Sequence, residues 1–472
     1  MPSFRFESTV DAPVDEVFAW HTRPGAMERL TPPWESLQVV DRSGGMQDGG
    51  TVTLRFRRGP VPITWTVKHT AFETGVLFRD EQVEGPFKRW VHTHRFQAEG
   101  ADRCRLVDEV EWEVPLGPLG EIFAGWAVES DLRRLFRFRH DRLAGDLHRL
   151  AQAGLSENLR IGITGASGLI GRELVPLLTA AGHTVVPFVR PGRSGNGDVI
   201  RWDPHKGDLD PRDLSGLDAV VHLAGESISG GRWTPEKKAR INESRTLGTR
   251  LLADALARAP SRPGVLVSSS AVGYYGNRGD GIIREDSDPG QGFLADVCRE
   301  WERATVPAER AGIRTVHLRA GIVLSPRGGA LAELLTPFKA GVGGRVGTGR
   351  QFMSWIDIDD FCGIILFALG QEALRRAVNG TAPLPVPNAT FADTLARVLG
   401  RPALVPFPSL AVRAVFGEMG RTLLLEGARV LPHRAEQAGF QFLYPSLEES
   451  LRHQLGRHED PMERTEEGRG DG

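Results

Sequence analysis

The chain has 472 residues, 40% of them hydrophobic and 25% charged, a composition typical of a folded protein with two or three domains. Its formal net charge of −2 at pH 7 provides no global field that would attract nucleic acid or an anionic membrane surface. We find neither a long apolar run nor a basic segment followed by one, so we expect no membrane span and no secretory signal. The three cysteines, Cys104, Cys298 and Cys362, form no CxxC pair and no disulfide framework, which favours a reducing, cytoplasmic location.

Residues 1–150 are predicted to form an antiparallel sheet followed by one long helix. After a first strand near the N-terminus, Asp15 can cap a helix that carries Val17, Phe18 and Trp20. Alternating apolar and polar residues, separated by Gly- and Pro-rich turns, predict further strands at 51–57, 64–68, 90–96 and 106–114. From about 121 to 150, apolar residues recur at spacings of three, four and seven, so a long amphipathic helix should pack on the sheet.

This order of elements, with the segment VDAPVDEVFAW at residues 10–20, resembles the START/Bet v 1-like superfamily, also called SRPBCC. The resemblance covers about residues 3–150 and implies an α+β helix-grip fold. It also implies a deep apolar cavity between the sheet and the long helix, suited to a hydrophobic small molecule. The family supplies no universal catalytic residues that could be carried over to this chain.

Two patterns in this region have functional alternatives. His92 and His94 are two residues apart and therefore share one face of a strand, which is the spacing of a metal-binding pair. No third ligand is identifiable, so the sequence favours a solvated or core-rim strand face, and we predict no metal site. The arginine-rich run LRRLFRFRH at 132–140 has two explanations, a nucleic-acid-binding patch or a helix with one charged face. We favour the charged helix face and predict no nucleic-acid binding.

The small and polar segment 151–158 precedes a strong strand pattern and is predicted to be the linker to a second domain. We place that domain at 159–387, followed by a mainly helical module at 388–456. The charged tail at 457–472 contains proline and glycine, and we expect it to be disordered.

A dinucleotide-binding turn begins the second domain. LRIGITGASGLIG, at 159–171, is an apolar strand that leads into a glycine triplet and then a helical pattern. The first glycine allows a sharp turn, the second lets the backbone approach a pyrophosphate, and the third lets helix and strand pack closely. The phosphate would lie on the helix N-terminus. The predicted binding residues of this turn are Gly165, Ser167, Gly168, Leu169, Ile170 and Gly171.

The next strand ends in Arg190, followed by Gly192 and Arg193, where NAD-specific sites present an acid to the ribose hydroxyls. An arginine can pair with a 2'-phosphate that an acid would repel, so we predict NADP(H); the alternative is a solvated strand end. Strand and helix patterns alternate from here, which predicts a doubly wound parallel α/β sheet of the Rossmann type. Further residues predicted to border the dinucleotide are Trp202, Asp203, Leu223, Ala224 and Gly225.

The motifs TGASGLIG, VVHLAG and VSSSAVGYYG together resemble the extended short-chain dehydrogenase/reductase superfamily, the epimerase/dehydratase group. Within that group, LAGESISGGRW, SRTLGT, RAGIVLSPRGGAL and GTGRQFMSWIDIDD resemble an atypical subfamily of nucleoside-diphosphate-sugar epimerases. The match covers about residues 159–455, and its fusion to an SRPBCC-like domain resembles an arrangement within that subfamily. Arg319 and Gly321 match the subfamily's RxG segment, which implies that they border the nicotinamide and the substrate.

The resemblance implies a serine that holds the substrate, a tyrosine acid/base and a lysine four residues later. Ser270 matches the serine. At the tyrosine and lysine positions the chain has Phe293 and Val297, or Leu294 and Cys298 one residue further on, so neither register supplies an acid/base.

A second departure is Arg245, which stands where many members carry asparagine. Other candidates for proton transfer are Tyr274, Tyr275, Glu226, and Lys237 or Lys238. Tyr275 could instead only pack, and Glu226 could contact ribose or substrate or could cap a helix.

Two functions remain open from the sequence. One is an NADP(H)-dependent epimerase or oxidoreductase that acts on a nucleotide-sugar-like or other small carbonyl or hydroxyl substrate. The other is a non-catalytic NADP(H) sensor or scaffold whose N-terminal domain binds a hydrophobic small molecule. The absent tyrosine and lysine favour the second function, whereas Ser270 and the glycine turn favour the first. The sequence does not predict the oligomeric state.

Overall fold

The computed structural model describes residues 2–115, 117–155, 158–192 and 197–458, which form two compact units. The main division lies between His148 and Arg149, and Thr179–Ala181 and His458 group with the first unit. Arg193 and most of the predicted tail, residues 459–472, lie outside the described residues. Among the described helices, none combines the length and the apolar composition needed to cross a membrane.

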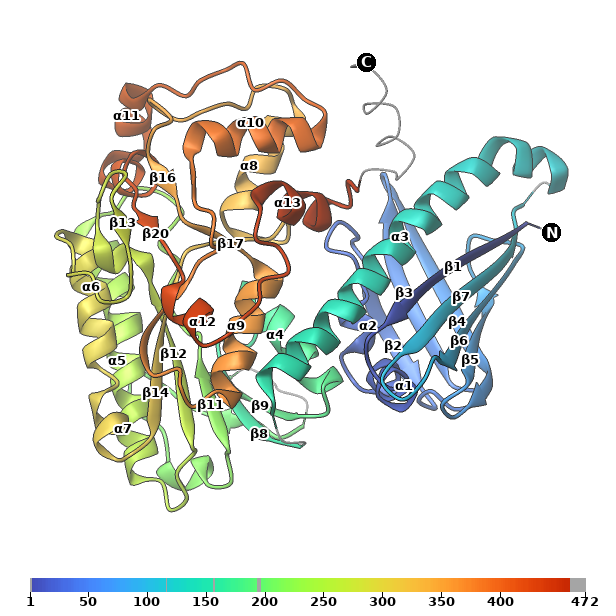
Figure 1. The fold of residues 1–472 in the computed structure, drawn as a ribbon, viewed down its shortest axis with the longest axis horizontal. Helices are drawn as coiled ribbons and strands as arrows, with labels where there is room; N and C mark the ends of the chain where they lie inside the picture. Colours follow the sequence, from blue (N-terminus) through green and yellow to red (C-terminus); the bar gives the residue numbers. More distant parts are fainter. Residues whose placement is uncertain (1, 116, 156–157, 193–196, 459–472) are drawn as a thin grey trace. The chain divides into compact units, whose positions relative to one another are not determined.

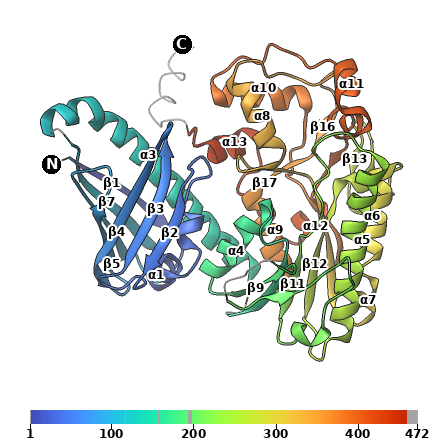
Figure 2. The same ribbon diagram turned by 180° about the vertical axis from the view of Figure 1, so that it is seen from behind.

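The N-terminal unit is a seven-stranded antiparallel sheet with the strand order β1-β7-β6-β5-β4-β3-β2. In Figures 1 and 2, helix α3 runs along one face of this sheet, as the helix-grip resemblance implied. The elements are β1 (Ser3–Val10), α1 (Val14–Thr22), α2 (Ala26–Arg29), β2 (Gln38–Ser43), β3 (Thr51–Arg58), β4 (Val61–Glu73), β5 (Leu77–Glu84), β6 (Arg89–Ala98), β7 (Cys104–Glu113) and α3 (Gly117–Ala153).

Aromatic and aliphatic side chains fill part of the space between this sheet and α3. Phe4, Val110 and Trp112 of the sheet pack against Leu132 and Phe136 of α3, which are 4% and 1% exposed. The apolar positions of α3 thus face the sheet at helical spacing, as the sequence predicted. The helix continues to Ala153, so the first three residues of the expected linker are helical.

The second unit contains a seven-stranded sheet in the order β10-β9-β8-β11-β12-β14-β18, whose neighbouring strands all pair in parallel. This is the predicted Rossmann topology, with β8 at the point where the strand order reverses. Its sheet and covering helices are β8 (Arg160–Thr164), α4 (Leu169–Ala180), β9 (Thr184–Val189), β10 (Ile200–Arg201), η1 (Pro211–Leu214), β11 (Ala219–His222), α5 (Pro235–Arg258), β12 (Val265–Ala271), η2 (Val272–Tyr275), α6 (Phe293–Arg303), α7 (Val306–Arg310), β14 (Arg314–Ala320), α9 (Ile358–Gly370) and β18 (Arg376–Gly380).

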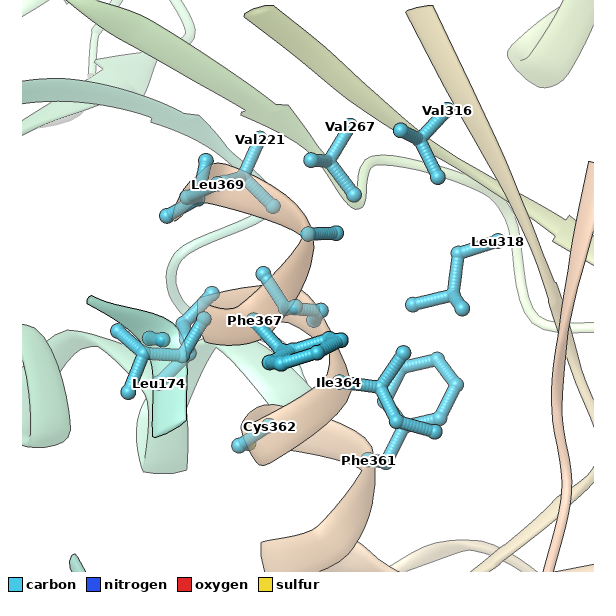
Figure 3. Packing of buried hydrophobic residues seen from close by; sticks show 14 of the residues in the cluster. Leu174, Val221, Val267, Val316, Leu318, Phe361, Cys362, Ile364, Phe367 and Leu369 are labelled. Carbon is cyan, nitrogen blue, oxygen red and sulfur yellow. The ribbon is translucent and has the colours of Figure 1, made fainter. Parts of the chain in front are cut away.

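Two apolar layers flank the parallel sheet. On one face, α4 and α9 pack against the strands, with Leu174, Val221, Val267 and Phe361 fully or almost fully buried (Figure 3). On the other face, α5 and α7 cover Val220 and other strand residues. Both faces are buried, which explains why these strands are continuous apolar runs rather than alternating ones.

The end of the GTGRQFMSWIDIDD motif begins the buried helix α9. The side chain of Asp357 accepts a hydrogen bond from Asp359 N at 2.8 Å, which caps the helix. Asp357 Oδ2 also accepts a 2.6 Å hydrogen bond from Ser450 Oγ of α13 (Leu447–Leu455). The acidic part of this motif therefore has a structural role, joining α9 to the last helix.

The C-terminal part of this unit forms a separate apolar cluster. Leu331 and Phe338 of α8 pack against Phe391 and Leu395 of α10, and Leu451 of α13 joins them. The remaining elements are β13 (Ile282–Ile283), β15 (Ile322–Leu324), α8 (Gly329–Lys339), β16 (Phe352–Met353), β17 (Trp355–Asp357), β19 (Val386–Pro387), α10 (Asn388–Leu399), α11 (Ser409–Gly420), η3 (Arg421–Leu425), β20 (Arg429–Val430) and α12 (His433–Gln437).

Candidate functional site

The glycine turn joins β8 to α4, as the sequence predicted. Gly165 has φ +71°, and a Cβ there would lie 2.9 Å from the backbone of Leu223 and Ala224. A Cβ on Gly171 would lie 2.4 Å from the carbonyl oxygen of Gly165. Both positions therefore require glycine, one for the turn and one for close packing of helix on strand. Ser167 and Gly168 are exposed at the start of α4, where backbone N–H groups can receive a pyrophosphate.

A buried histidine fixes the neighbouring strand β11 against this turn. His222 Nδ1 lies 2.7 Å from Thr164 Oγ1, and His222 Nε2 lies 2.8 Å from Thr249 Oγ1 of α5. The hydroxyl of Thr164 also accepts hydrogen bonds from Leu223 N and Ala224 N, at 3.1 and 3.2 Å. Burial lowers the pKa of His222 to about 4, so its ring is neutral at pH 7.

Arg190 follows the last residue of β9 and is exposed. It has no hydrogen bond or ion pair with any described residue, so its guanidinium is available to a ligand. Trp202 is 4% exposed and packs edge-on against Phe188, with ring centroids 5.8 Å apart. Asp203 Oδ1 accepts a hydrogen bond from His205 N at 3.1 Å, which closes a turn after β10. Arg190 is thus the exposed member of this predicted trio, whereas Trp202 belongs to the core.

A cavity of about 1190 Å³ opens beside the glycine turn. Its walls include Leu223 and Gly225 after β11, Ser270 of β12 and Gly321 after β14. Helix α6 and the segment around η3 complete it. The carboxyl ends of three parallel strands thus meet at one cavity, which is where open α/β sheets bind their ligands.

Beneath this cavity, Ser270 belongs to a buried polar network. Its Oγ donates a 2.8 Å hydrogen bond to Glu302 Oε1. Glu302 is also paired with Arg319, whose Nε lies 2.8 Å from Oε1 and whose Nη2 lies 2.9 Å from Oε2. Arg319 Nη1 donates to the hydroxyl of Tyr275 at 2.8 Å, and that hydroxyl donates to Asn379 Oδ1 at 2.7 Å. Ser270 therefore links the cavity to a chain of paired side chains.

This network gives Tyr275 and Arg319 positions that the sequence did not reveal. Tyr275 is fully buried, and burial raises its pKa to about 12. Arg319 is 4% exposed and lies over the ring of Tyr274, 3.5 Å from its centroid. None of these three side chains is among the residues that line the cavity, whereas the neighbouring Gly321 is.

The residues in the tyrosine and lysine registers all line the cavity. Phe293 and Val297 lie on one face of α6, with Leu294 and Cys298 beside them. Burial, together with the charge of Glu302, raises the pKa of the Cys298 thiol to about 12, so the thiol is neutral. The wall that would carry an acid/base is therefore apolar, as these residue types led us to expect from the sequence.

Glu226 lies outside the lining residues and pairs with Lys237 of α5, with Nζ 2.8 Å from Oε1. This hydrogen bond lowers the pKa of Glu226. Arg245 instead lines the cavity, and its Nη1 donates to the carbonyl oxygens of Glu226 and Ile241, both at 3.0 Å. Arg245, at a position where many members of the superfamily carry asparagine, thus places a cation in the cavity wall.

Sequence reasoning missed two residues of this site. Glu302 holds both Ser270 and Arg319, but its contacts become visible only when α6 lies beside β12 and β14. Trp301, 5% exposed, lines the cavity, and its buried indole N–H has no hydrogen-bond partner among the described residues. The one available signal was the helical spacing of Phe293, Val297 and Trp301, which puts all three on one face.

Comparison with known proteins identifies the family. The model of the NAD dependent epimerase/dehydratase family matches residues 161–379. Epimerase family protein Mb2239 of Mycobacterium bovis is 43% identical over 294 residues, which are 62% of this chain and 97% of that protein. The chain belongs to the epimerase family. The model for polyketide cyclase/dehydrase and lipid transport matches residues 10–138, and a domain of unknown function, DUF1731, matches residues 407–454. Both resemblances stated from the sequence are thereby confirmed.

Two solved structures extend this result. A nucleoside-diphosphate sugar epimerase from Corynebacterium glutamicum is 31% identical, with a TM-score of 0.80, and the match covers 98% of this chain and 92% of that one. Human epimerase family protein SDR39U1, solved with NADPH, is 37% identical, with a TM-score of 0.58, over 62% of this chain and 98% of that one. This epimerase-family protein therefore has relatives that match both of its units and relatives that match the Rossmann unit alone.

Proposed function

We propose that the epimerase-family unit binds NADP(H), with the pyrophosphate on the turn between β8 and α4 and the 2'-phosphate at Arg190. Two features support this proposal. The turn leaves no room for a Cβ at Gly165 or Gly171. One strand later, Arg190 is exposed and has no hydrogen bond or ion pair in the described part of the chain. The NADPH in the human relative favours the same cofactor. These residues fit the dinucleotide, which when bound supplies a hydride-transferring nicotinamide.

We propose further that the cavity receives a nucleotide-sugar-like or other small molecule with a carbonyl or hydroxyl group. Its volume of about 1190 Å³ is sufficient for such a substrate beside a nicotinamide ring. Arg245 in its wall can pair with an anionic group, and the Corynebacterium relative is named as a nucleoside-diphosphate sugar epimerase.

In this proposal Ser270 positions the substrate. Its hydroxyl proton is engaged by Glu302, so Oγ can accept a hydrogen bond from a substrate hydroxyl. Both oxygens of Glu302 accept hydrogen bonds from Arg319 or Ser270, so passing a proton from Ser270 to Glu302 would weaken the ion pair with Arg319. Proton transfer through Ser270 is therefore expected to be slow.

A second candidate function is NADP(H) binding without turnover, in which the N-terminal cavity of about 550 Å³ binds a hydrophobic small molecule. It is supported by Phe293 and Val297, which line the cavity where an acid/base pair would be needed. General acid–base transfer typically contributes about 10²–10⁴-fold to rate, so its absence would leave binding as the main activity.

Titration of the full chain with NADPH and with NADH tests the cofactor assignment. Because Arg190 is exposed, we expect a preference for NADPH of roughly three- to tenfold that weakens as salt is raised. Arg190→Glu should reverse the order, whereas Arg258→Glu, on the exposed end of α5, should not change it. Equal affinities in the wild type, or a preference that survives Arg190→Glu, would contradict the role of Arg190.

Turnover assays distinguish the two functions. NADP(H)-dependent conversion of a panel of sugar nucleotides that is lost in Ser270→Ala, with dinucleotide affinity unchanged, supports the enzyme. Tight NADPH binding without conversion of any member of the panel supports the sensor or scaffold. If Ser270→Ala converts sugar nucleotides as fast as the wild type, the acid/base must be another residue. Glu226 and Tyr275 would then be tested next.

A further inference from the structure

The cavity of the N-terminal unit contains a cluster of buried histidines and carboxylates. Four neighbouring strands contribute to it, because Asp80 pairs in register with both His69 and His92, and His94 pairs with Asp108. Successive residues of a strand alternate between faces, so His92 and His94 point the same way, into the cavity. Their side chains are 7% and 9% exposed, which corrects the expectation of a solvated or core-rim strand face.

Asp108 orients two of these histidines. Its Oδ1 lies 2.7 Å from His92 Nε2, and its Oδ2 lies 2.7 Å from His140 Nε2 of α3. The remaining nitrogen of His140 is hydrogen-bonded to Ser8 Oγ at 2.6 Å. Because Nε2 of His92 donates to a carboxylate, its other nitrogen, Nδ1, carries a lone pair. Carboxylates that fix the tautomer of a histidine in this way are typical of metal sites.

Asp80 is arranged in a similar way. Its Oδ1 accepts a 2.5 Å hydrogen bond from His69 Nδ1, which leaves Oδ2 facing His94 Nε2 at 3.9 Å. One oxygen or nitrogen atom from each of Asp80, His92 and His94 lies within 4.8 Å of the other two. Ligands of one transition-metal ion, each about 2.0–2.2 Å from it, lie roughly 3–4 Å apart, so shifts of under about 1 Å would bring all three onto one ion.

One imidazole nitrogen of the cluster is buried without a hydrogen bond in the described part of the chain. His69 Nε2 has no partner among the described residues, and the His69 side chain, which is 5% exposed, lines the cavity. His94 Nδ1 lies 2.7 Å from Asp108 Oδ1, which leaves Nε2 as the nitrogen that faces Asp80. A desolvated imidazole nitrogen is costly unless something satisfies it, so the open His69 Nε2 favours a polar ligand in this cavity beside the three candidate metal ligands.

We propose that Asp80, His92 and His94 bind a divalent transition-metal ion of the Zn²⁺, Fe²⁺ and Co²⁺ class inside the N-terminal cavity. Two imidazoles and one carboxylate suit these ions, whereas Mg²⁺ and Ca²⁺ take shells of oxygen atoms. Three protein ligands leave coordination positions open. These positions face a cavity of about 550 Å³ lined by Phe78, Trp90 and Phe136, so an apolar molecule with a carbonyl or hydroxyl oxygen could complete the shell.

No third ligand could be identified from the sequence because Asp80 lies on β5, a strand that the alternation pattern did not predict. Only the register of the sheet brings this carboxylate between His69 and His92.

Metal titration of the full chain tests the proposal. Protein stripped with a chelator should bind about one equivalent of Co²⁺, with visible absorption bands of a nitrogen- and oxygen-ligated ion, and Zn²⁺ should displace it. Asp80→Asn and His94→Gln should each weaken binding at least roughly a hundredfold. His205→Gln removes an exposed histidine of the other unit and should leave binding unchanged. NADPH binding by each variant reports whether the rest of the chain remains folded.

Absence of a saturable site, or a site that survives both Asp80→Asn and His94→Gln, would overturn the proposal. Loss of Co²⁺ binding in His205→Gln alone would assign the ion to the protein surface and would also overturn it. If the cluster variants do not fold, the proposal can be tested on the wild type. Crystals grown with Zn²⁺ and measured at the zinc absorption edge show where the ion binds. An anomalous peak between Asp80, His92 and His94 supports the site, and peaks only elsewhere refute it.

Discussion

Replacing Glu302 with glutamine should destabilise the Rossmann unit more than any exposed charge substitution. The carboxylate receives three hydrogen bonds of 2.8–2.9 Å, two from Arg319 and one from Ser270. The side chains of Arg319 and Glu302 are only 4% and 13% exposed. Burial lowers the pKa of Arg319, but the hydrogen bonds and charge of Glu302 raise it by more, so the guanidinium stays charged. In Glu302→Gln that charge would remain buried with no opposite charge.

Removing one partner of a buried ion pair costs about 3–5 kcal/mol. For a unit of about 300 residues, with an unfolding entropy of about 2.1 cal/mol/K per residue, this corresponds to a fall in Tm of about 5–8 °C. Thermal unfolding of the full chain, followed by calorimetry with and without NADPH to assign the transition to its unit, measures the change. The ligand should shift only the transition of the Rossmann unit.

Glu300→Gln is the matched control for this experiment. It lies on the same helix α6, is exposed, and makes one side-chain hydrogen bond, accepted from Asn242 Nδ2 at 2.9 Å. We expect its Tm within about 1 °C of the wild type. A Glu302→Gln protein that unfolds within about 2 °C of the wild type would refute the reasoning, since Arg319 would then be satisfied without the carboxylate.

Three further changes test other parts of the same unit. Gly171→Ala places a Cβ 2.4 Å from a backbone oxygen, so titration should give at least roughly tenfold weaker NADPH binding. His222 has a folded pKa of about 4 against 6.5 when unfolded, so the unfolded state binds more protons between these values. The contribution of neutral His222 to the free energy of unfolding is therefore complete above about pH 6.5 and falls, by up to about 3 kcal/mol, as the pH drops toward 4. Urea unfolding at several pH values should show a smaller loss of stability in His222→Gln than in the wild type. Phe293→Tyr combined with Val297→Lys restores an acid/base pair to the cavity wall and should increase NADP(H)-dependent turnover of sugar nucleotides.

Each of these expectations has a result that would contradict it. Unchanged NADPH affinity in Gly171→Ala would mean that the turn can relax away from the new methyl group. An equally steep loss of stability between pH 6.5 and 4 in His222→Gln would assign the acid sensitivity to other groups. No gain in turnover from the double substitution, with NADPH binding intact, would mean that the position of the tyrosine is not the factor that limits chemistry.

In the N-terminal unit, the strands that alternate apolar and polar residues were predictable, whereas β2 and β5, which do not alternate, were missed. The predicted segments 51–57 and 90–96 fall within β3 and β6. By contrast, β5 reads LFRDEQVE, in which charged residues occupy positions on both faces, so it carries no period-two signal. Residues 38–43, which form β2 at the edge of the sheet, are likewise mostly exposed and gave no pattern.

The glycine turn could be predicted because its requirements are local. A sharp turn and a close helix–strand contact depend on residues within a few positions of one another, so spacing alone identifies Gly165 and Gly171. The roles of Glu302 and Asp80 depend on partners that are 32 and 11 residues away and reach them through helix packing and strand register. No pattern within one segment encodes such contacts, and for this reason both residues became visible only in the folded chain.

The cavity of the Rossmann unit and the cavity of the N-terminal unit differ in the chemistry that their walls can support. The Rossmann cavity lies beside the glycine turn and has Ser270 in its wall, but Phe293, Val297 and a neutral Cys298 make another part of that wall apolar. The N-terminal cavity has no nucleotide turn, yet its wall carries a carboxylate and several imidazoles. Binding energy for a dinucleotide and groups able to hold a metal ion are thus encoded in separate units. We therefore expect substitutions in one cavity to leave ligand binding in the other cavity unchanged. If NADPH changed the affinity for the metal ion, the effect would have to pass from one unit to the other, because the two ligands share no site.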